Sequence, residues 1–421
     1  MKKNIMTCVM LATTLALTGC NSDSDDDTDK VVGCPSKPAD RTITLCVTAL
    51  PESHPSGDQI YLAGTMNGWH AGGEADQEII LEDHGNGSYS YHLHFAEDTN
   101  IHQFKFTRGS WESVEIDADN YDIPNRSVEF SGQYRVEDMQ IAKWSDIDGS
   151  FGGRPTVVGN LKLHTIDAFP INDGERTVRV WLPESYDAKR AESFPVIYAW
   201  DGQNLFDERT AGYGMEWKVD ETLTELAADH VVIGFDSPTG DKNGLSGRKR
   251  RYIEYSAFDW KHPEEGSIVT RGDETVDFVV DTLIPKFESE YNIGGSTEKR
   301  TIMGSSMGGY MSLYTMSYRP NVFGTALALS HATNDNYGGV ALREYLTNTG
   351  FSSDAKFYFD MGDQETVGSW GPTEWLNGQK AMSEVFKTLG IKAEEAVIAG
   401  GLHDEKSWSK RFPDIFKRML Q

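Results

Sequence analysis

Two arrangements of apolar residues divide the chain. From Arg41 to Ala142, apolar and polar positions alternate with period two over short runs that are separated by Gly, Asn and Asp, a pattern typical of β-strands. No amphipathic helix is visible there. About 100 residues of this kind predict an all-β, immunoglobulin-like sandwich. The expected strands lie at residues 42–47, 59–62, 88–93 and 101–106.

Strands and helices alternate in the rest of the chain, after a Gly-rich linker at residues 146–155. Such alternation predicts an α/β domain with a mostly parallel central sheet covered on both faces. The expected strands lie at residues 176–182, 194–200, 230–235, 300–303, 325–329, 356–360 and 393–398, and the expected helices at 275–291, 307–318, 382–389 and 406–420.

The motif G-x-S-x-G occupies residues 304–308, between an expected strand and an expected helix. This setting is that of a nucleophile elbow, a tight turn that raises the central serine above the carboxyl edge of the sheet. The spacing selects Ser306 rather than Ser305. The backbone N–H of Met307 would then point at the oxyanion that develops during acyl transfer.

A serine nucleophile needs a base, and in α/β-hydrolases the chain order is Ser, acid, His. His403 follows the last expected strand, where the base belongs, whereas His331 lies just past the end of an earlier strand. The acid would orient the imidazole and stabilise its charged form. Three candidates stand at or after the strand 356–360, namely Asp360, Asp363 and Glu365.

These residues resemble the putative esterase family of α/β-hydrolases, which includes enterochelin esterase-like enzymes, S-formylglutathione hydrolases and feruloyl or acetyl xylan esterases. The resemblance implies an ester hydrolase. Its acid motif G-x-x-[DE] points to Glu365, with Asp363 and Asp360 as fallbacks, and its Asp-Gly-Gln loop implies a second oxyanion donor at the backbone of Gly202 and Gln203. The matching segments are 177–183, 195–207, 251–255, 304–310, 359–365 and 400–408.

Two segments of the N-terminal part, residues 61–69 and 104–111, resemble carbohydrate-binding modules of the starch- and glycogen-binding type. The resemblance implies that Trp69 and Trp111 stack on sugar rings and that Lys105 and Asn125 donate hydrogen bonds to them. Flat aromatic faces pack on the apolar faces of pyranoses. The alternative is that these tryptophans belong partly to the domain core and that the domain only docks on its neighbour.

The first residues have the layout of an export signal. Lys2 and Lys3 precede an apolar stretch that ends in Leu17-Thr18-Gly19-Cys20, which resembles a bacterial lipobox. The resemblance implies a signal peptide at 1–19, a lipid anchor on Cys20 and, because Asn21 follows the cysteine, the outer membrane. A cleaved signal without lipid is the alternative. The acidic segment 20–40 would be a solvated tether.

Charge and cysteine content narrow the picture further. The 421 residues carry 39 Lys+Arg and 65 Asp+Glu, a net charge of -26, which would repel the phosphates of a nucleic acid. No apolar run after the signal has the length of about 20 residues that a membrane-spanning helix needs. Once Cys8 leaves with the signal and Cys20 is acylated, Cys34 and Cys46 are expected to form a disulfide, with two free thiols as the alternative.

The sequence therefore predicts a lipid-anchored envelope esterase with a β-sandwich at 41–145 and an α/β-hydrolase domain at 156–421. The substrate would be a small-molecule or polysaccharide ester, with α-glucan binding by the first domain, and no metal or organic cofactor is implied. A siderophore trilactone remains an alternative substrate. A non-catalytic glycan-binding lipoprotein is the alternative of another class.

Overall fold

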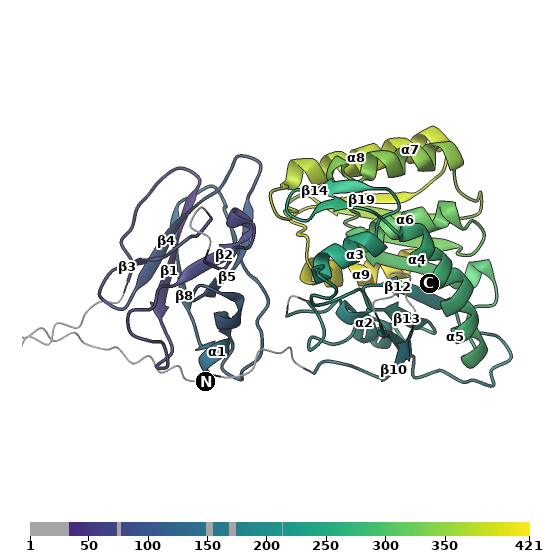
Figure 1. The fold of residues 1–421 in the computed structure, drawn as a ribbon, viewed down its shortest axis with the longest axis horizontal. Helices are drawn as coiled ribbons and strands as arrows, with labels where there is room; N and C mark the ends of the chain where they lie inside the picture. The colour runs from purple at the N-terminus through teal and green to yellow at the C-terminus, as the bar shows by residue number, and fades with distance from the viewer. Residues whose placement is uncertain (1–32, 74–76, 149–154, 168–173, 213) are drawn as a thin grey trace, which may run out of the picture.

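The computed structural model describes residues 33–73, 77–148, 155–167, 174–212 and 214–421. It contains a β-rich N-terminal domain and a larger α/β domain, shown side by side in Figure 1. The export signal, Cys20 and most of the linker lie outside the described residues. No helix in the described part of the chain is both long and apolar enough to cross a membrane.

The N-terminal domain is all-β, as the alternating pattern predicts. One sheet has the strand order β3-β4-β1-β8 and another has the order β2-β5-β7, while β6 and β9 form a separate pair. The central strand β1 is antiparallel to β4 and parallel to β8. The strands are β1 (Thr42–Ala49), β2 (Tyr61–Gly64), β3 (Glu82–Asp83), β4 (Tyr89–His94), β5 (Ile101–Thr107), β6 (Glu115–Ile116), β7 (Arg126–Glu129), β8 (Arg135–Gln140) and β9 (Lys143–Trp144), followed by the short helix α1 (Ser145–Asp148).

The core of this domain is built from the inward residues of both sheets. Leu45 of β1, Phe104 and Phe106 of β5, and Trp144 of β9 are fully buried in one apolar cluster. The predicted disulfide between Cys34 and Cys46 is present and ties the chain before β1 to that strand.

An eight-stranded sheet forms the centre of the second domain, in the order β10-β11-β13-β12-β16-β17-β18-β19. The two pairs at its start, β10 with β11 and β11 with β13, are antiparallel, and every other pair is parallel. The strands are β10 (Asn160–Ile166), β11 (Arg176–Leu182), β12 (Val196–Trp200), β13 (Val231–Phe235), β16 (Arg300–Ser305), β17 (Thr325–Leu329), β18 (Lys356–Gly362) and β19 (Glu394–Ile398).

Helices cover both faces of this sheet (Figure 1). One apolar core joins one face to α3–α8, and a second core joins the other face to α2 and α9. A short hairpin of β14 (Trp260–His262) and β15 (Gly266–Ile268) follows α3. The helices are α2 (Val219–Glu225), α3 (Gly247–Glu254), α4 (Gly272–Phe278), α5 (Ile284–Glu290), α6 (Met307–Tyr318), α7 (Gly339–Thr349), α8 (Pro372–Leu389) and α9 (Glu405–Met419).

Candidate active site

Ser306 occupies a sharp turn between β16 and α6. Its backbone has φ 54° and ψ -122°, a conformation that costs free energy for any residue other than glycine. The turn is fixed by two backbone hydrogen bonds, from the Ser306 N–H to the Leu329 carbonyl at 3.0 Å and from the Ala332 N–H to the Ser306 carbonyl at 2.9 Å. This strained strand-to-helix turn is the geometry of a nucleophile elbow.

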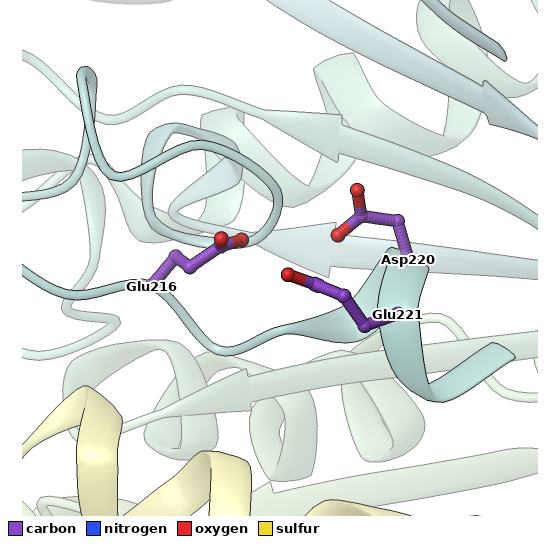
Figure 2. A group of neighbouring side chains, drawn as sticks. All are labelled: Glu216, Asp220 and Glu221. Carbon is purple, nitrogen blue, oxygen red and sulfur yellow. The ribbon is translucent and has the colours of Figure 1, made fainter. Parts of the chain in front are cut away.

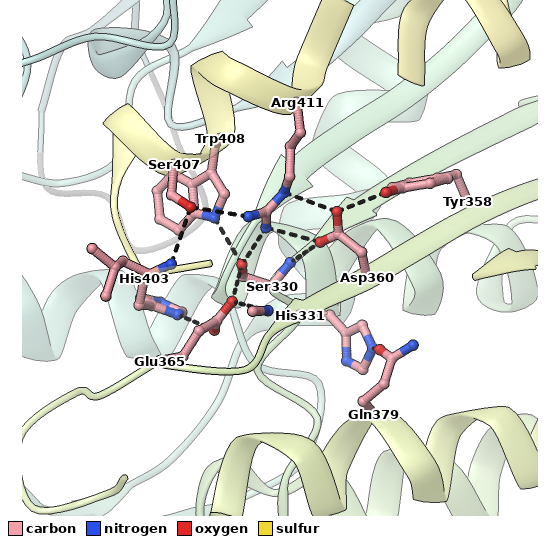
Figure 3. Close-up of polar contacts among 12 residues, drawn as sticks. Ser330, His331, Tyr358, Asp360, Glu365, Gln379, His403, Ser407, Trp408 and Arg411 are labelled. Carbon is pink, nitrogen blue, oxygen red and sulfur yellow. Dashed lines mark hydrogen bonds and ion pairs between the residues drawn. The ribbon is translucent and has the colours of Figure 1, made fainter. Parts of the chain in front are cut away.

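His403 lies on the loop between β19 and α9, and a carboxylate holds its ring. The His403 Nδ1 is 2.8 Å from Glu365 Oε2 (Figure 3). Because an ionised carboxylate only accepts hydrogen bonds, this contact places the ring proton on Nδ1 and leaves Nε2 as the basic nitrogen. The ring of the buried Trp375 packs at 4.4 Å from the imidazole, and the ring of Trp408 meets it edge-on at 5.3 Å.

Glu365 is fully buried and well supplied with donors. Its Oε1 accepts hydrogen bonds from the Ser330 hydroxyl at 2.5 Å and from the Gly362 N–H at 2.6 Å. Burial by itself raises the pKa of Glu365, but His403, Arg411 and Ser330 together outweigh burial and hold this pKa below its ordinary value. The carboxylate is therefore ionised where it meets the imidazole.

The other two candidate acids have different partners. Asp360 is buried in an ion pair with Arg411, accepts a hydrogen bond from the Tyr358 hydroxyl at 2.8 Å, and has a pKa that burial raises. Asp363 accepts a hydrogen bond from the Gly400 N–H at 2.8 Å and so braces the loop that leads to His403. Of the three candidates, Glu365 is the one that contacts the histidine.

The sheet gathers the three residues at one edge. The three residues follow strands of the parallel part of the sheet: Ser306 follows β16, Glu365 follows β18 and His403 follows β19. These strands are adjacent or one strand apart, so their carboxyl ends lie at the same edge. In the described part of the chain the Ser306 hydroxyl has no hydrogen-bond partner. Catalytic hydrogen bonds of this kind often form only in the substrate complex.

Two backbone segments flank the serine as candidate oxyanion donors. Met307 is the first residue of α6, so its N–H has no acceptor within the helix. The loop after β12 approaches β13 so closely that a Cβ on Gly202 would lie 2.5 Å from the Gly234 carbonyl carbon. The side-chain amide of Gln203 exchanges hydrogen bonds with Ser237 at 2.9 and 3.0 Å, which fixes the position of its backbone.

His331 is a structural residue in this arrangement. Its ring is fully buried and makes hydrogen bonds of 2.8 Å with Gln379 Oε1 and with the Thr333 hydroxyl. Burial lowers its pKa to about 4, so the ring is neutral and both nitrogens are engaged.

The candidate glycan-binding residues do not all share one surface. The rings of Trp69 and Trp111 lie 6.4 Å apart with a 33° tilt, and Trp111 is 45% exposed. Asn125 is half-buried just before β7. Lys105, in contrast, is buried, and its ammonium lies 2.5 Å from Asp122 Oδ1. The structure does not bring Lys105 to the exposed aromatic surface.

The N-terminal domain contacts the loops that carry the acid and the histidine. The Asn100 N–H donates to Gln364 Oε1 at 2.8 Å, directly beside Glu365. The side-chain amide of Gln103 on β5 donates to the carboxylate of Asp404, directly beside His403, and both groups are buried. Nothing in the sequence pattern indicates these contacts, because they join residues hundreds of positions apart.

The comparisons with known proteins agree with this geometry. A family described as "Putative esterase" matches residues 171–419, more than half of the chain. The chain belongs to this esterase family. It is therefore a serine carboxylic ester hydrolase with the α/β-hydrolase fold that its sheet already displays, as the sequence predicts.

Among curated relatives, an α-amylase from Niallia circulans is 31% identical over 110 residues, which is 26% of this chain and only 8% of that protein. The uncharacterized protein YbbA from Bacillus subtilis is 24% identical over 247 residues, which is 57% of this chain and 90% of that protein.

Among solved structures, the enterobactin esterase FES from Shigella flexneri has a TM-score of 0.51 at 13% identity, over 87% of this chain and 90% of its own. An IroE-like serine hydrolase from Shewanella oneidensis has a TM-score of 0.48 at 16% identity, over 61% of this chain and 80% of its own. At such identities the likeness to FES shows the fold alone. The part of this chain that FES covers extends well beyond residues 171–419, which the esterase family matches.

Proposed function

We propose that this esterase removes acyl groups from glycans through an acyl-enzyme on Ser306. The observation that carries the mechanism is the 2.8 Å contact between the His403 ring and the buried Glu365 carboxylate, at the same sheet edge as the strained serine turn. Arrangements of this kind convert a weakly nucleophilic hydroxyl into an attacking group.

In the proposed reaction the Ser306 oxygen attacks the ester carbonyl while His403 Nε2 takes the hydroxyl proton. The backbone N–H groups of Met307 and Gln203 stabilise the oxyanion, and Glu365 stabilises the imidazolium. His403 then returns the proton to the leaving alcohol. Water, activated by the same imidazole, attacks the acyl-enzyme and releases the acid together with the free serine. No cofactor takes part in these steps.

Two surfaces support a glycan substrate. The half-buried Trp69 ring and the exposed Trp111 ring of the N-terminal domain offer adjacent aromatic faces for sugar rings. In the esterase domain a groove of about 450 Å³ is lined by Trp260 and Trp370. The groove lies near the site, since only the packed rings of Tyr337 and Trp375 stand between Trp370 and His403.

The basic run at residues 248–251 does not favour an anionic substrate. Arg251 forms a bidentate ion pair with Asp201 at 2.7 and 2.8 Å, and Arg248 pairs with Glu264 and Glu265. Charges that are already paired attract an anion weakly.

The 110-residue similarity to an α-amylase adds support for binding of α-glucans by this protein.

A siderophore trilactone is the second candidate substrate. It is favoured by the two-domain likeness to the enterobactin esterase FES, which covers 87% of this chain. The two candidates differ chemically, because a trilactone yields a hydroxy acid from a ring opening whereas an acylated glycan yields acetate or a hydroxycinnamate and leaves the sugar intact.

A panel of esters separates these candidates. Acetylated xylan, feruloyl esters and ferric catecholate trilactones are each given to the wild type and to Ser306→Ala, with p-nitrophenyl acetate and butyrate as reference esters. We expect turnover of the glycan esters that Ser306→Ala abolishes. Selective turnover of the trilactone would instead favour the second candidate, and equal rates in wild type and variant would refute the serine mechanism.

Glycan binding is tested on the first domain. Binding to amylose or glycogen is measured for the wild type and for the variants Trp69→Ala and Trp111→Ala. Loss of a stacking ring is expected to weaken binding about two- to tenfold, by analogy with the roughly 0.5–1.5 kcal/mol that an aromatic contact supplies. Absence of wild-type binding would remove the glucan part of the proposal.

We also propose that the enzyme is anchored in the outer membrane through lipid on Cys20. The support is the lipobox-like sequence ending at Cys20 and the acidic segment that follows it. Cys20→Ser should release the protein from the membrane fraction, whereas Cys8→Ser, a change within the expected signal peptide, should not. Retention of Cys20→Ser in the membrane fraction would contradict the anchor.

A further inference from the structure

A group of three carboxylates lies away from the serine, at the start of α2. Glu216 precedes the helix, and Asp220 and Glu221 lie in its first turn. One oxygen from each side chain lies within 4.8 Å of the others. Figure 2 shows the three carboxylates pointing toward a common centre.

Two of these side chains are fully buried, and most oxygens of the cluster have no hydrogen-bond partner. Glu216 and Asp220 are 0% exposed. Both carboxylate oxygens of Glu216, the Oδ1 atom of Asp220 and the Oε2 atom of Glu221 are buried and accept no hydrogen bond. Burial of an unpaired carboxylate is among the costliest arrangements in a protein interior, so these groups are stabilised by a bound cation or, without one, by protonation.

Ion pairs do not provide that charge, although Lys218 attracts the Glu216 carboxylate without forming an ion pair with it. Within the described residues, no Lys, Arg or His nitrogen forms an ion pair with the three carboxylates. Arg209, a nearby cation in sequence, is engaged by Asp207. The remaining Asp220 oxygen accepts a hydrogen bond from the Val158 N–H at 2.6 Å, where the chain enters the esterase domain.

We propose that Glu216, Asp220 and Glu221 bind one Ca²⁺ ion. Hard cations prefer carboxylate oxygens, and ligands on opposite sides of Ca²⁺ lie about 4.6–5.2 Å apart, against about 4.0–4.2 Å for Mg²⁺. Ligand atoms within 4.8 Å of one another fit inside the coordination shell of Ca²⁺. Mg²⁺ also rarely uses a cage made of protein carboxylates.

The role of this ion is structural. It would join α2 to the segment before it and, through Asp220, to Val158, whose carbonyl accepts a hydrogen bond from the Trp181 indole at 2.8 Å. The same segment also reaches the first domain, since Gly214 packs directly against the Asp122 side chain. Occupancy would thus stabilise the junction of the two domains without touching the serine.

The test uses the full-length protein, purified in detergent and stripped with EDTA. Ca²⁺ at 10 mM is expected to raise Tm by about 5 °C, because a ligand that binds only the folded state stabilises it. Mg²⁺ at the same concentration should raise Tm less than half as far. Tb³⁺, a Ca²⁺ analogue, should give emission sensitised by the neighbouring Trp217, and Ca²⁺ should displace it.

Isosteric variants assign the ligands. Glu216→Gln and Asp220→Asn should each weaken Ca²⁺ binding at least tenfold, while Glu225→Gln, at an exposed position on the same helix, should bind as the wild type does. Binding of neither Ca²⁺ nor Tb³⁺ by the wild type would overturn the proposal, as would wild-type affinity in both ligand variants. If a ligand variant does not fold, two measurements on the wild type and on Trp217→Phe test the proposal instead. Both proteins should contain calcium, and the Tb³⁺ emission that Ca²⁺ displaces in the wild type should be lost in Trp217→Phe.

Discussion

At the scale of single residues, Glu365 has the most specific task. Its two oxygens are divided between functions: Oε2 contacts the His403 ring, and Oε1 is held by Ser330 and Gly362. Ser330 in turn accepts hydrogen bonds from the Arg411 guanidinium at 2.6 Å and from the Trp408 indole at 2.8 Å. This buried network fixes the direction from which the carboxylate meets the imidazole (Figure 3).

Replacement of Glu365 by Gln should lower kcat about 10²–10⁴-fold, because a neutral amide stabilises the imidazolium less and can favour the wrong tautomer. Steady-state kinetics on p-nitrophenyl acetate measure the effect. Asp363→Asn is the matched control, since its amide oxygen still accepts the hydrogen bond from Gly400, and its kcat should stay within about threefold of the wild type. Equal losses in both variants would contradict the assignment.

Glu405 makes the fold sensitive to pH. Burial raises its pKa from 4.5 to about 8, and Asp404 and Asp201 add to the shift. The folded state therefore keeps a proton that the unfolded state releases above pH 4.5, so the free energy of unfolding falls as pH rises from about 4.5 to about 8.

Glu405→Gln should remove this part of the pH dependence. Between pH 5 and 8 the wild type should lose about 2–4 kcal/mol of stability relative to the variant, measured by urea unfolding. The amide introduced by this substitution would still accept the hydrogen bond that the Asn204 amide donates to Glu405 at 3.0 Å. If the free energy of unfolding changed with pH in the same way in the wild type and in Glu405→Gln, the prediction would be wrong. Glu384→Gln, on the surface of α8, is the control and should keep the pH dependence of the wild type.

At the scale of elements, the turn from β16 to α6 depends on glycine. A Cβ on Gly304 would lie 2.6 Å from the Gly308 carbonyl carbon, in the backbone that carries the strained Ser306. Gly304→Ala should therefore lower the free energy of unfolding by about 3 kcal/mol or more, measured with urea. Gly371→Ala, where the nearest atom would be 3.8 Å from the added Cβ, should change it by less than about 1 kcal/mol. Similar stability in both variants would contradict this account.

The sequence pattern predicts the central elements best. The predicted bounds 176–182, 307–318 and 325–329 are those of β11, α6 and β17. These elements are nearly all buried, so their apolar runs have clear ends. The pattern does not predict β10, because it is an edge strand with mostly exposed or half-exposed residues and Leu163 is 64% exposed.

Two helices differ from the prediction for local reasons. α8 begins at Pro372 rather than at residue 382, because its inward positions include Gly378, which packs on the Asn334 backbone, and Gln379, which binds His331. These residues conceal the apolar period. The predicted helix 275–291 is divided into α4 and α5 by a π-helical turn at Val279–Leu283, which precedes Pro285 in the first turn of α5.

At the scale of the whole molecule, the two domains meet beside the active site. Asn100 and Gln103 of the first domain bind the residues next to Glu365 and His403, and Asp98 accepts a hydrogen bond from Thr373 at 2.9 Å. The serine, the histidine and the candidate acids can be found from motif spacing along one domain. These interdomain contacts cannot, because they depend on how two separately patterned domains dock.

Gln103→Ala should lower kcat about tenfold, because the Asp404 carboxylate would lose a charge-assisted hydrogen bond and the loop carrying His403 would lose support. The KM for p-nitrophenyl acetate should change little, since a small ester does not reach the first domain. Gln59→Ala, at an exposed position of the same domain, is the control. A normal kcat in Gln103→Ala would show that the contact only docks the domains.

Covalent labelling tests the central claim most directly. A fluorophosphonate probe phosphonylates only a serine that its own active site activates, and peptide mass spectrometry identifies the modified residue. We predict stoichiometric labelling of Ser306, retained in Ser305→Ala and lost in Ser306→Ala and His403→Ala. Labelling of another serine in the folded wild type, or no labelling of a wild type that hydrolyses p-nitrophenyl acetate, would contradict the account.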